Sequence, residues 1–324
     1  MSDAASLERL AARLAPLFEA GARVSIRGVA SVGAQRRTLF VDVRNAEVAT
    51  RAVVQIMGDV LAATDVECEA ALLRKAGAEG VPVPAVLAVD ASLRAIASEH
   101  VEGESIPRRI LRLVDATPEL GERLTRDCGE ALAAIHRIGV AALPELPDLA
   151  DPGRYVDELE RLLDSLSTPH PVFRLGVGWL RRHAPSPPER ATLVHGDFRL
   201  GNLLVDEGGL RAVLDWELAH LGDPMEDLAW LCLRTWRFGR DDRSVGGFGS
   251  LDRLRDAYVE AGGVFRTEAF AWWTVARTVW WGLGLARQVQ AVLDGQADSI
   301  VLAASGRRVV ELEYDLLEAI RPGD

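Results

Sequence analysis

The sequence predicts an α+β fold in which a β-rich first part, up to residue 102, is followed by a mainly helical second part. Short β-rich runs, separated by Gly, Pro and Asp, dominate the first part. After Gly103, apolar residues recur mostly at the three-and-four spacing of amphipathic helices. A chain of 324 residues is also long enough for two lobes, each with its own core.

The first part is expected to contain a packing helix, a sheet and a second helix. A leucine stripe at helical spacing predicts the packing helix over residues 6–18. β-rich runs bounded by turn residues predict strands, which cover residues 24–43, 52–57, 85–89 and 96–98. Between them, Asp65 opens a helix that continues to Lys75.

The second part is expected to be built from amphipathic helices, over residues 120–138, 155–166, 174–183 and 307–320. The segment from Arg234 to Gly249 is rich in arginine and glycine, which indicates a mobile, solvated surface loop. Arg277 lies in a long apolar helix. It is expected to be paired or to face a cleft, because an unpaired buried charge is costly.

A polar turn between two strands carries the chemistry. Asp197 and Asn202 lie between the apolar runs 192–194 and 203–205, and a return strand leads to Asp215. Phosphoryl transfer needs a carboxylate to accept the proton of an attacking hydroxyl, and oxygen ligands to hold Mg²⁺. Asp197 fits the first role, and Asn202 and Asp215 fit the second. Gly, Asp and Asn also make simple turns, but three chemically matched residues at kinase spacing favour a site.

The pattern His195-Gly196-Asp197-x-x-x-x-Asn202, followed by Asp215-Trp216-Glu217, resembles the aminoglycoside phosphotransferase and choline kinase superfamily. It is most similar to the phosphotransferase enzyme family branch that also occurs joined to acyl-CoA dehydrogenases. The resemblance implies a two-lobed, protein-kinase-like fold, with a small β-rich N-lobe over residues 1–102 and a larger, mainly helical C-lobe over 103–324.

The same resemblance implies the cofactors ATP and Mg²⁺, with Asp197 as catalytic base and with Asn202 and Asp215 as metal ligands. Asp227 matches a family position and is expected to brace the catalytic loop, and His195 is expected to be a core residue with the same task.

In the N-lobe, the resemblance implies a set of cofactor-binding residues. Ser31 and Gly33 belong to a glycine turn that would face the nucleotide phosphates, although two glycines five apart also fit an ordinary hairpin. The Glu99 carbonyl and the Val101 amide would read the adenine edge. Glu69, in the second helix, matches the family's glutamate, which forms an ion pair with a basic residue of the preceding strand.

The strand partner of Glu69 departs from the family pattern. Members carry Lys or Arg there, whereas the matching position looks to be Gln55, which can donate a hydrogen bond but brings no charge. Either a nearby arginine (Arg36, Arg37 or Arg51) supplies the charge, or nucleotide binding is weak, or catalysis is lost. On spacing alone, Glu69 also fits a solvated helix face.

Composition excludes several partners. A net charge of −11 and a pI near 5.2 argue against nucleic acid and against an anionic membrane, because both attract a basic face. Three widely spaced cysteines and an N-terminus without a basic start and an apolar run indicate a cytoplasmic protein. The sequence does not indicate the oligomeric state.

Three functional hypotheses follow. The first is an ATP- and Mg²⁺-dependent phosphotransferase that acts on a hydroxyl of a small molecule. The arginines after residue 233, with the resemblance to domains joined to acyl-CoA dehydrogenases, favour a non-cationic acceptor such as a hydroxyacyl-CoA. The second is a nucleotide-binding pseudokinase without phosphotransfer, which Gln55 motivates. The third is an aminoglycoside-type antibiotic kinase, which would need carboxylates around a polycationic acceptor.

Overall fold

The structure is a computed structural model that describes residues 2–18, 21–32, 36–45, 49–57 and 65–321. Residue contacts divide the chain into two compact units. The first contains residues 1–105, 141–146 and 202–219, and the second contains the remaining segments. The expected division at residue 102 is a single cut in the chain, whereas the units of the structure are discontinuous.

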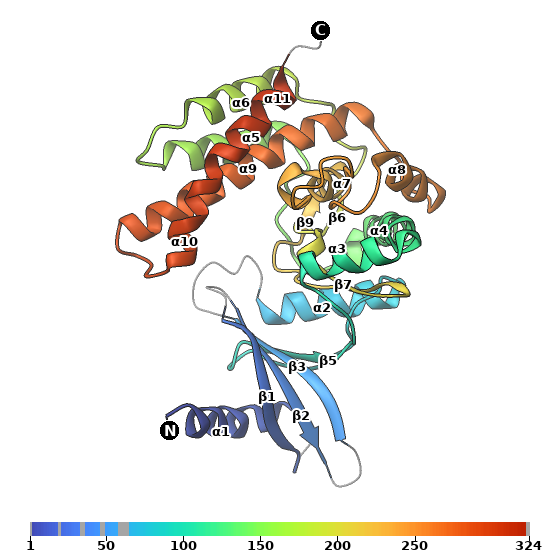
Figure 1. The fold of residues 1–324 in the computed structure, drawn as a ribbon, viewed down its shortest axis with the longest axis vertical. Coiled ribbons are helices and arrows are strands. Elements are labelled where there is room, and N and C mark those ends of the chain that lie inside the picture. The colour runs from blue at the N-terminus through green and yellow to red at the C-terminus, as the bar shows by residue number, and fades with distance from the viewer. Residues whose placement is uncertain (1, 19–20, 33–35, 46–48, 58–64, 322–324) are drawn as a thin grey trace. The chain divides into compact units, whose positions relative to one another are not determined.

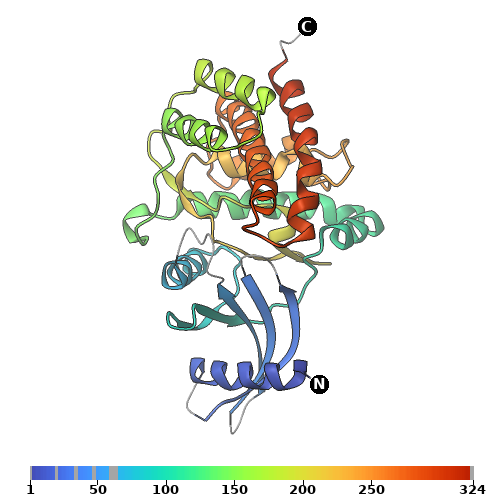
Figure 2. The same ribbon diagram turned by 90° about the vertical axis from the view of Figure 1, so that its left-hand side faces the viewer.

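A five-stranded antiparallel sheet forms most of the first unit, in the order β1-β2-β3-β5-β4. The strands are β1 (Arg23–Val32), β2 (Arg36–Arg44), β3 (Ala49–Met57), β4 (Val86–Asp90) and β5 (Ala95–Glu99). Leu39, Val41 and Val54 alternate toward one face of the sheet, where they pack against Leu14 and Leu17. Leu14 ends the helix α1 (Ser2–Leu14), which Figure 2 shows lying across the strands. The predicted packing helix is therefore confirmed.

The opposite face of the sheet carries the helix α2 (Val66–Ala78) (Figure 1). Met57 of β3 packs there against Val66 and Ala70. The Asp65 carboxylate caps the helix by accepting a hydrogen bond from Cys68 N–H at 2.7 Å. The helix thus starts where the sequence predicted, and its first turns bring Glu69 to this face of the sheet.

The second unit is mainly helical, as predicted. Its helices are α3 (Pro107–Ala116), α4 (Pro118–Arg137), α5 (Pro152–Asp164), α6 (Pro171–Arg182), α7 (Met225–Cys232), α8 (Leu251–Glu260), α9 (Thr267–Leu293), α10 (Ile300–Ser305) and α11 (Val309–Ile320). The long α9 packs against α5, α6, α7 and α11 (Figure 1). Three of the helices begin earlier than predicted because each has proline at its first position, where a missing N–H is tolerated.

The segment from Arg234 to Gly249 is only in part the solvated loop that was predicted: residues 237–244 are exposed or half-buried. Each arginine is engaged within this unit: Arg234 with Asp241 and Asp315, Arg240 and Arg243 with Asp115, and Arg237 with the Cys232 carbonyl. Residues 245–249 are buried. The glycines allow this burial because they let the backbone approach its neighbours closely.

Two short antiparallel strand pairs border the segments that carry Asp197, Asn202 and Asp215. In the second unit, β6 (Thr192–Val194) pairs with β9 (His220–Gly222). In the first unit, β7 (Leu203–Asp206) pairs with β8 (Gly209–Val213). Within the described part of the chain, no helix combines the length and the apolarity needed to cross a membrane.

Gly249 tests the buried loop. A Cβ at this position would lie 1.8 Å from Thr125 Oγ1, so Gly249→Ala is expected to lower the free energy of unfolding by about 1–3 kcal/mol. Urea denaturation measures this change. Gly139→Ala is the matched control, because a Cβ there meets nothing within 4 Å. The double variant Gly249→Ala/Thr125→Ala should regain part of the loss, and equal stability of Gly249→Ala and Gly139→Ala would contradict close packing.

Candidate active site

The β7–β8 hairpin holds the two predicted metal ligands side by side. Asn202 immediately precedes β7, and Asp215 lies two residues beyond the end of β8. Leu203 pairs with Val213, and Leu214 N–H donates to the Asn202 carbonyl at 2.8 Å. Because the hairpin register is fixed, the backbone positions that carry the amide and the carboxylate are neighbours at the open end of the hairpin.

The backbone at Asp215 is unusual. Its φ is +66°, in the left-handed region that few residues other than glycine adopt, although Asp and Asn tolerate it best. The next side chain, Trp216, is fully buried and donates from Nε1 to the Val213 carbonyl at 3.3 Å. The buried indole anchors the turn, so the turn can hold Asp215 in a backbone conformation that residues other than glycine seldom adopt.

A buried arginine joins the acidic residues of this unit. The Arg36 guanidinium donates to both carboxylate oxygens of Glu69, at 2.9 and 2.8 Å. Its Nε donates to Glu217 at 2.9 Å and lies 3.5 Å from the Asp215 carboxylate. Burial lowers the pKa of Arg36, but the three carboxylates together raise it above its ordinary value. Three carboxylates around one guanidinium leave two negative charges in excess.

Arg36 is thus the cation that pairs with Glu69, whereas Gln55 carries no charge. Arg36 lies opposite Met57 and Gln55 lies opposite Thr38 in the β2–β3 register. Directly paired residues share a face of the sheet, so Arg36 and Gln55 lie on the same face, the one that packs on α2. Arg36 was one of three arginines that the sequence offered, and it is the one that contacts Glu69.

The other predicted nucleotide residues lie along this sheet. Ser31 pairs with Thr38 through the backbone, and Gly33 lies outside the described residues. Glu99 ends β5, where its N–H donates to the Ala85 carbonyl at 2.9 Å, and Val101 follows two residues later.

His100, which lies between Glu99 and Val101, lines a cavity of about 220 Å³ with Gly28, Phe40 and Ala52. The Phe40 and His100 rings meet edge to face, with centroids 5.6 Å apart. The predicted hinge segment thus borders a small cavity on the sheet.

The donor set fits Mg²⁺. This ion prefers oxygen ligands and is commonly held by one or two protein side chains, with waters and phosphate oxygens completing its shell. Asn202 and Asp215 offer such oxygens next to a cluster with excess negative charge. The described residues contain no group of three or more His, Cys, Asp or Glu side chains arranged to hold a metal, and a shared protein–phosphate site does not require one.

In the second unit, the Asp197 carboxylate is oriented by two donors. Trp230 Nε1–H donates to Asp197 Oδ1 at 2.8 Å, and Arg199 Nε–H donates to the same oxygen at 2.9 Å. The Arg199 guanidinium also lies over the Trp236 ring, 4.7 Å from its centroid. These contacts restrict the rotation of the candidate base.

Asp227 holds the loop that carries this base. Its carboxylate accepts hydrogen bonds from His195 N–H at 2.8 Å and from Gly196 N–H at 2.9 Å. His136 lies 3.2 Å from the same carboxylate and bonds Tyr258 through its other ring nitrogen. The predicted brace is confirmed, and His136 supports the carboxylate from α4.

The pKa of Asp227 reflects two opposing effects. Complete burial raises the pKa of its carboxyl, but His136 and the loop around His195 lower it by more, so the net shift is downward. The carboxylate therefore remains charged at neutral pH and can accept both loop amides.

Arg277 holds the same loop from its carbonyl side. It donates to the Gly196 carbonyl at 2.6 Å and to Glu226 at 2.7 Å, while its guanidinium stacks on Trp230 and Trp280. The prediction that this buried arginine is paired is confirmed. Gly196 has a φ of +80°, which lets one peptide segment present its N–H to Asp227 and its carbonyl to Arg277.

Sequence reasoning gave no role to Arg199, Glu226 or Trp230. Arg199 lies inside the recognised motif, two residues after Asp197, so its contact with Asp197 could have been predicted from the sequence. Glu226 and Trp230 act on residues far along the chain, and no local spacing indicates such contacts.

Comparisons with known proteins agree on one family. Residues 27–273 match the family model described as "Phosphotransferase enzyme family". Among curated proteins, acyl-CoA dehydrogenase family member 10 of Mus musculus is 31% identical over 178 residues, which cover 52% of this chain and 16% of that protein. Acyl-CoA dehydrogenase family member 11 of Gallus gallus is 33% identical over 161 residues, which cover 47% and 20%. The chain therefore matches only a minor part of these relatives' length.

Solved structures confirm the kinase-like fold. A Ralstonia eutropha protein assigned as an aminoglycoside phosphotransferase superposes with a TM-score of 0.71 at 20% identity, over 98% of both chains. Choline kinase LicA of Streptococcus pneumoniae gives 0.61 at 16%, over 94% and 98%. A thermostable aminoglycoside phosphotransferase with bound ADP and hygromycin B gives 0.63 at 16%, over 98% and 100%.

Replacing Asp227 tests the loop brace. Asp227→Asn puts an amide where two N–H donors need acceptors, so the free energy of unfolding at pH 7 is expected to fall by about 3 kcal/mol. Because the folded pKa is depressed, the contribution is complete above the unfolded value near pH 4 and is lost as the pH falls through the folded value.

Urea denaturation from pH 7 to pH 3 measures the effect. The stability gap between wild type and Asp227→Asn should narrow at the acid end of that range. Asp242→Asn is the control, because its side chain is 80% exposed. A gap that stays constant with pH would contradict the depressed pKa.

Proposed function

The chain belongs to the phosphotransferase enzyme family and is a small-molecule kinase, and we propose that it transfers the γ-phosphate of ATP to a hydroxyl of a small, non-cationic molecule. Nucleotide use is in keeping with the ADP complex of the structurally similar aminoglycoside phosphotransferase. The proposed cofactors are ATP and Mg²⁺.

The observation that carries the proposal is the β7–β8 hairpin with its acidic surroundings. Asn202 and Asp215 flank its open end, and Asp215 is one of three carboxylates around Arg36. When bound there, Mg²⁺ would neutralise charge on the nucleotide phosphates. Asn202 and Asp215 would hold it, and Arg36 would add a fixed positive charge on the same unit.

Asp197 is the proposed catalytic base. As the hydroxyl oxygen of the acceptor bonds to the γ-phosphorus, its proton passes to the Asp197 carboxylate, and the bond between the γ-phosphorus and the bridging oxygen breaks to leave ADP. The hydrogen bonds from Trp230 and Arg199 orient this carboxylate before the acceptor arrives. Ser31, Gly33, Gln55, Glu99 and Val101 are proposed to contact the nucleotide.

The pseudokinase alternative rested on the missing charge at Gln55. Arg36 contacts Glu69 with a bidentate geometry, so the reason for expecting weak nucleotide binding is removed. An intact set of base and metal-binding side chains also favours an enzyme, since a protein that only binds nucleotide has no chemical need for Asp197.

The acceptor is proposed to carry no cluster of positive charges. The relatives named as acyl-CoA dehydrogenases favour a hydroxylated acyl compound. The arginines between residues 234 and 243 do not contribute to this choice, because each is engaged within its own unit. An aminoglycoside acceptor remains a control for the substrate screen.

Asp197→Asn tests the base. The variant is expected to lower kcat for phosphate transfer by about a thousandfold, because proton removal contributes on that scale, and to leave the Kd for ATP within about twofold. Transfer is measured with radiolabelled ATP across hydroxyl-bearing metabolites, acyl-CoA thioesters included. Asp252→Asn, on the exposed side of α8, is the matched control. Retention of full activity in Asp197→Asn would exclude this role.

Arg36 and Gln55 can be separated by a pair of variants. Arg36→Gln is expected to raise the Kd for ATP with Mg²⁺ by about tenfold, because a charge-assisted contact is lost. Gln55→Arg should leave that Kd unchanged, since the cation is already present. Calorimetry measures both, and Arg44→Gln at the exposed end of β2 is the control. Tighter binding by Gln55→Arg would show that Arg36 does not serve the nucleotide.

A further inference from the structure

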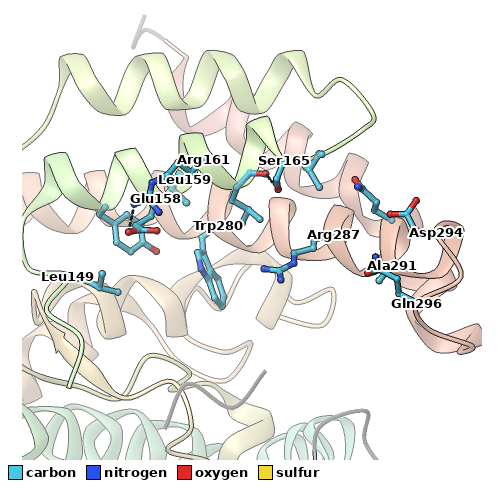
Figure 3. Close-up of a pocket in the computed structure, with 14 residues that line it drawn as sticks. Leu149, Glu158, Leu159, Arg161, Ser165, Trp280, Arg287, Ala291, Asp294 and Gln296 are labelled. Carbon is cyan, nitrogen blue, oxygen red and sulfur yellow. Dashed lines mark hydrogen bonds and ion pairs between the residues drawn. The ribbon is translucent and has the colours of Figure 1, made fainter. Parts of the chain in front are cut away.

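The helical unit contains an open cavity of about 670 Å³ between α5 and α9. Its volume is in the range of small-molecule sites. Figure 3 shows one wall formed by α9, with Trp280, Arg287 and Ala291 along it, and another formed by α5, with Glu158 and Leu159. The α9 residues recur at intervals that place them on one helix face.

The lining joins an apolar surface to a small number of charges. Leu149 and the α5 leucines Leu159 and Leu162 line the cavity together with Trp280. Arg161 pairs with Glu158, and the pair is exposed. Arg287 and Asp294 also line the cavity, and neither makes an ion pair within the described part of the chain. Arg287 is therefore a cation of this lining that can receive a ligand's negative charge, while the Asp294 carboxylate lies seven residues further along the chain.

Two residues that line the cavity contact side chains that hold the candidate catalytic loop. The Trp280 ring meets Trp230 edge to face, with centroids 5.6 Å apart, and Trp230 donates to Asp197. Trp280 also lies 4.1 Å from the Arg277 guanidinium, which holds the Gly196 carbonyl. A second lining residue, Tyr155, contacts Arg277 at 3.4 Å. The wall of the cavity is therefore part of the support of the candidate base.

We propose that this cavity binds the phosphate acceptor and that Arg287 is a specificity-determining residue. The apolar body of the acceptor would lie on Trp280 and the leucines, and an anionic group would contact Arg287. This inference rests on the proposed function. The anion is either the carboxylate of a free hydroxy acid or a charged group of its thioester, and both share an apolar chain with a negative group.

A series of acceptors with a common chain tests the inference. The probes are 10-hydroxydecanoate, its primary amide, 10-amino-1-decanol and the coenzyme A thioester of 10-hydroxydecanoate. Calorimetry on the full chain measures binding without nucleotide, and labelled ATP measures transfer to each probe. Arg287→Gln is compared with Arg307→Gln, which removes an exposed arginine outside the cavity. Thermal unfolding checks that both variants fold.

The expected result is an order of affinity in which the acid exceeds the amide and the amide exceeds the amine. Arg287→Gln should raise the Kd for the acid about fivefold to tenfold, because one charge-assisted contact in a partly exposed site is lost. The amide should change less than twofold, and Arg307→Gln should change neither. If the thioester binds more tightly than the acid and loses more in Arg287→Gln, the anion belongs to the thioester; the reverse assigns it to the carboxylate.

Two results would overturn the inference. One is an equal response of Arg287→Gln and Arg307→Gln to the acid and the thioester. The other is the absence of binding by all four probes at millimolar concentration. Because binding is measured without nucleotide, a failure of the cavity assignment can be distinguished from a failure of the proposed kinase activity. Binding that depends on Arg287 without any transfer would leave the cavity assignment standing and contradict the kinase, whereas transfer that is insensitive to Arg287 would do the opposite.

Discussion

The peptide segment at Gly196 is held between two buried charges of opposite sign, and the second unit's part of the site depends on it. The Asp227 carboxylate accepts hydrogen bonds from the loop amides, and the Arg277 guanidinium donates one to the Gly196 carbonyl. Glu226, the neighbour of Asp227 in α7, pairs with Arg277 and also accepts from His220. Each buried charge thus has an ionic or hydrogen-bonding partner, which such groups require inside a protein. Removing one of these side chains would leave another buried charge without its partner.

The sequence predicted the fold class, and it singled out the residues of the candidate site, because both depend on local patterns. Strand runs and helical spacing are local, and so is the interval from Asp197 to Asn202. Long-range partners were not predictable in the same way. Trp230 and Arg277 act on the catalytic loop from 33 and 81 residues away, and only packing of α7 and α9 brings them there. The buried loop at residues 245–249 was missed because its glycines were interpreted as flexibility, whereas they serve close packing.

Arg36 and Gln55 show that the basic partner of a helix carboxylate can come from a different strand of the same sheet. Sequence comparison looks for the basic residue at one strand position. The antiparallel register puts Arg36 on the neighbouring strand but on the same face of the sheet, so its long side chain reaches the same helix carboxylate. The cation beside Glu69 is thus provided from β2. The departure at Gln55 is therefore a relocation of charge within the first unit.

In the proposed mechanism, the first unit and the candidate catalytic loop supply features that would serve any phosphate acceptor: oxygen ligands, a fixed cation and an oriented base. The acceptor must then be distinguished by surfaces that lie outside these parts. In the helical unit, α5 and α9 offer such a surface, and two of its residues, Tyr155 and Trp280, also contact Arg277. A cavity whose wall also supports the base couples acceptor binding to the position of Asp197. An acceptor that packs poorly on Trp280 would thus lose rate as well as affinity, because the indole that it fails to contact also stabilises the arginine that holds the loop.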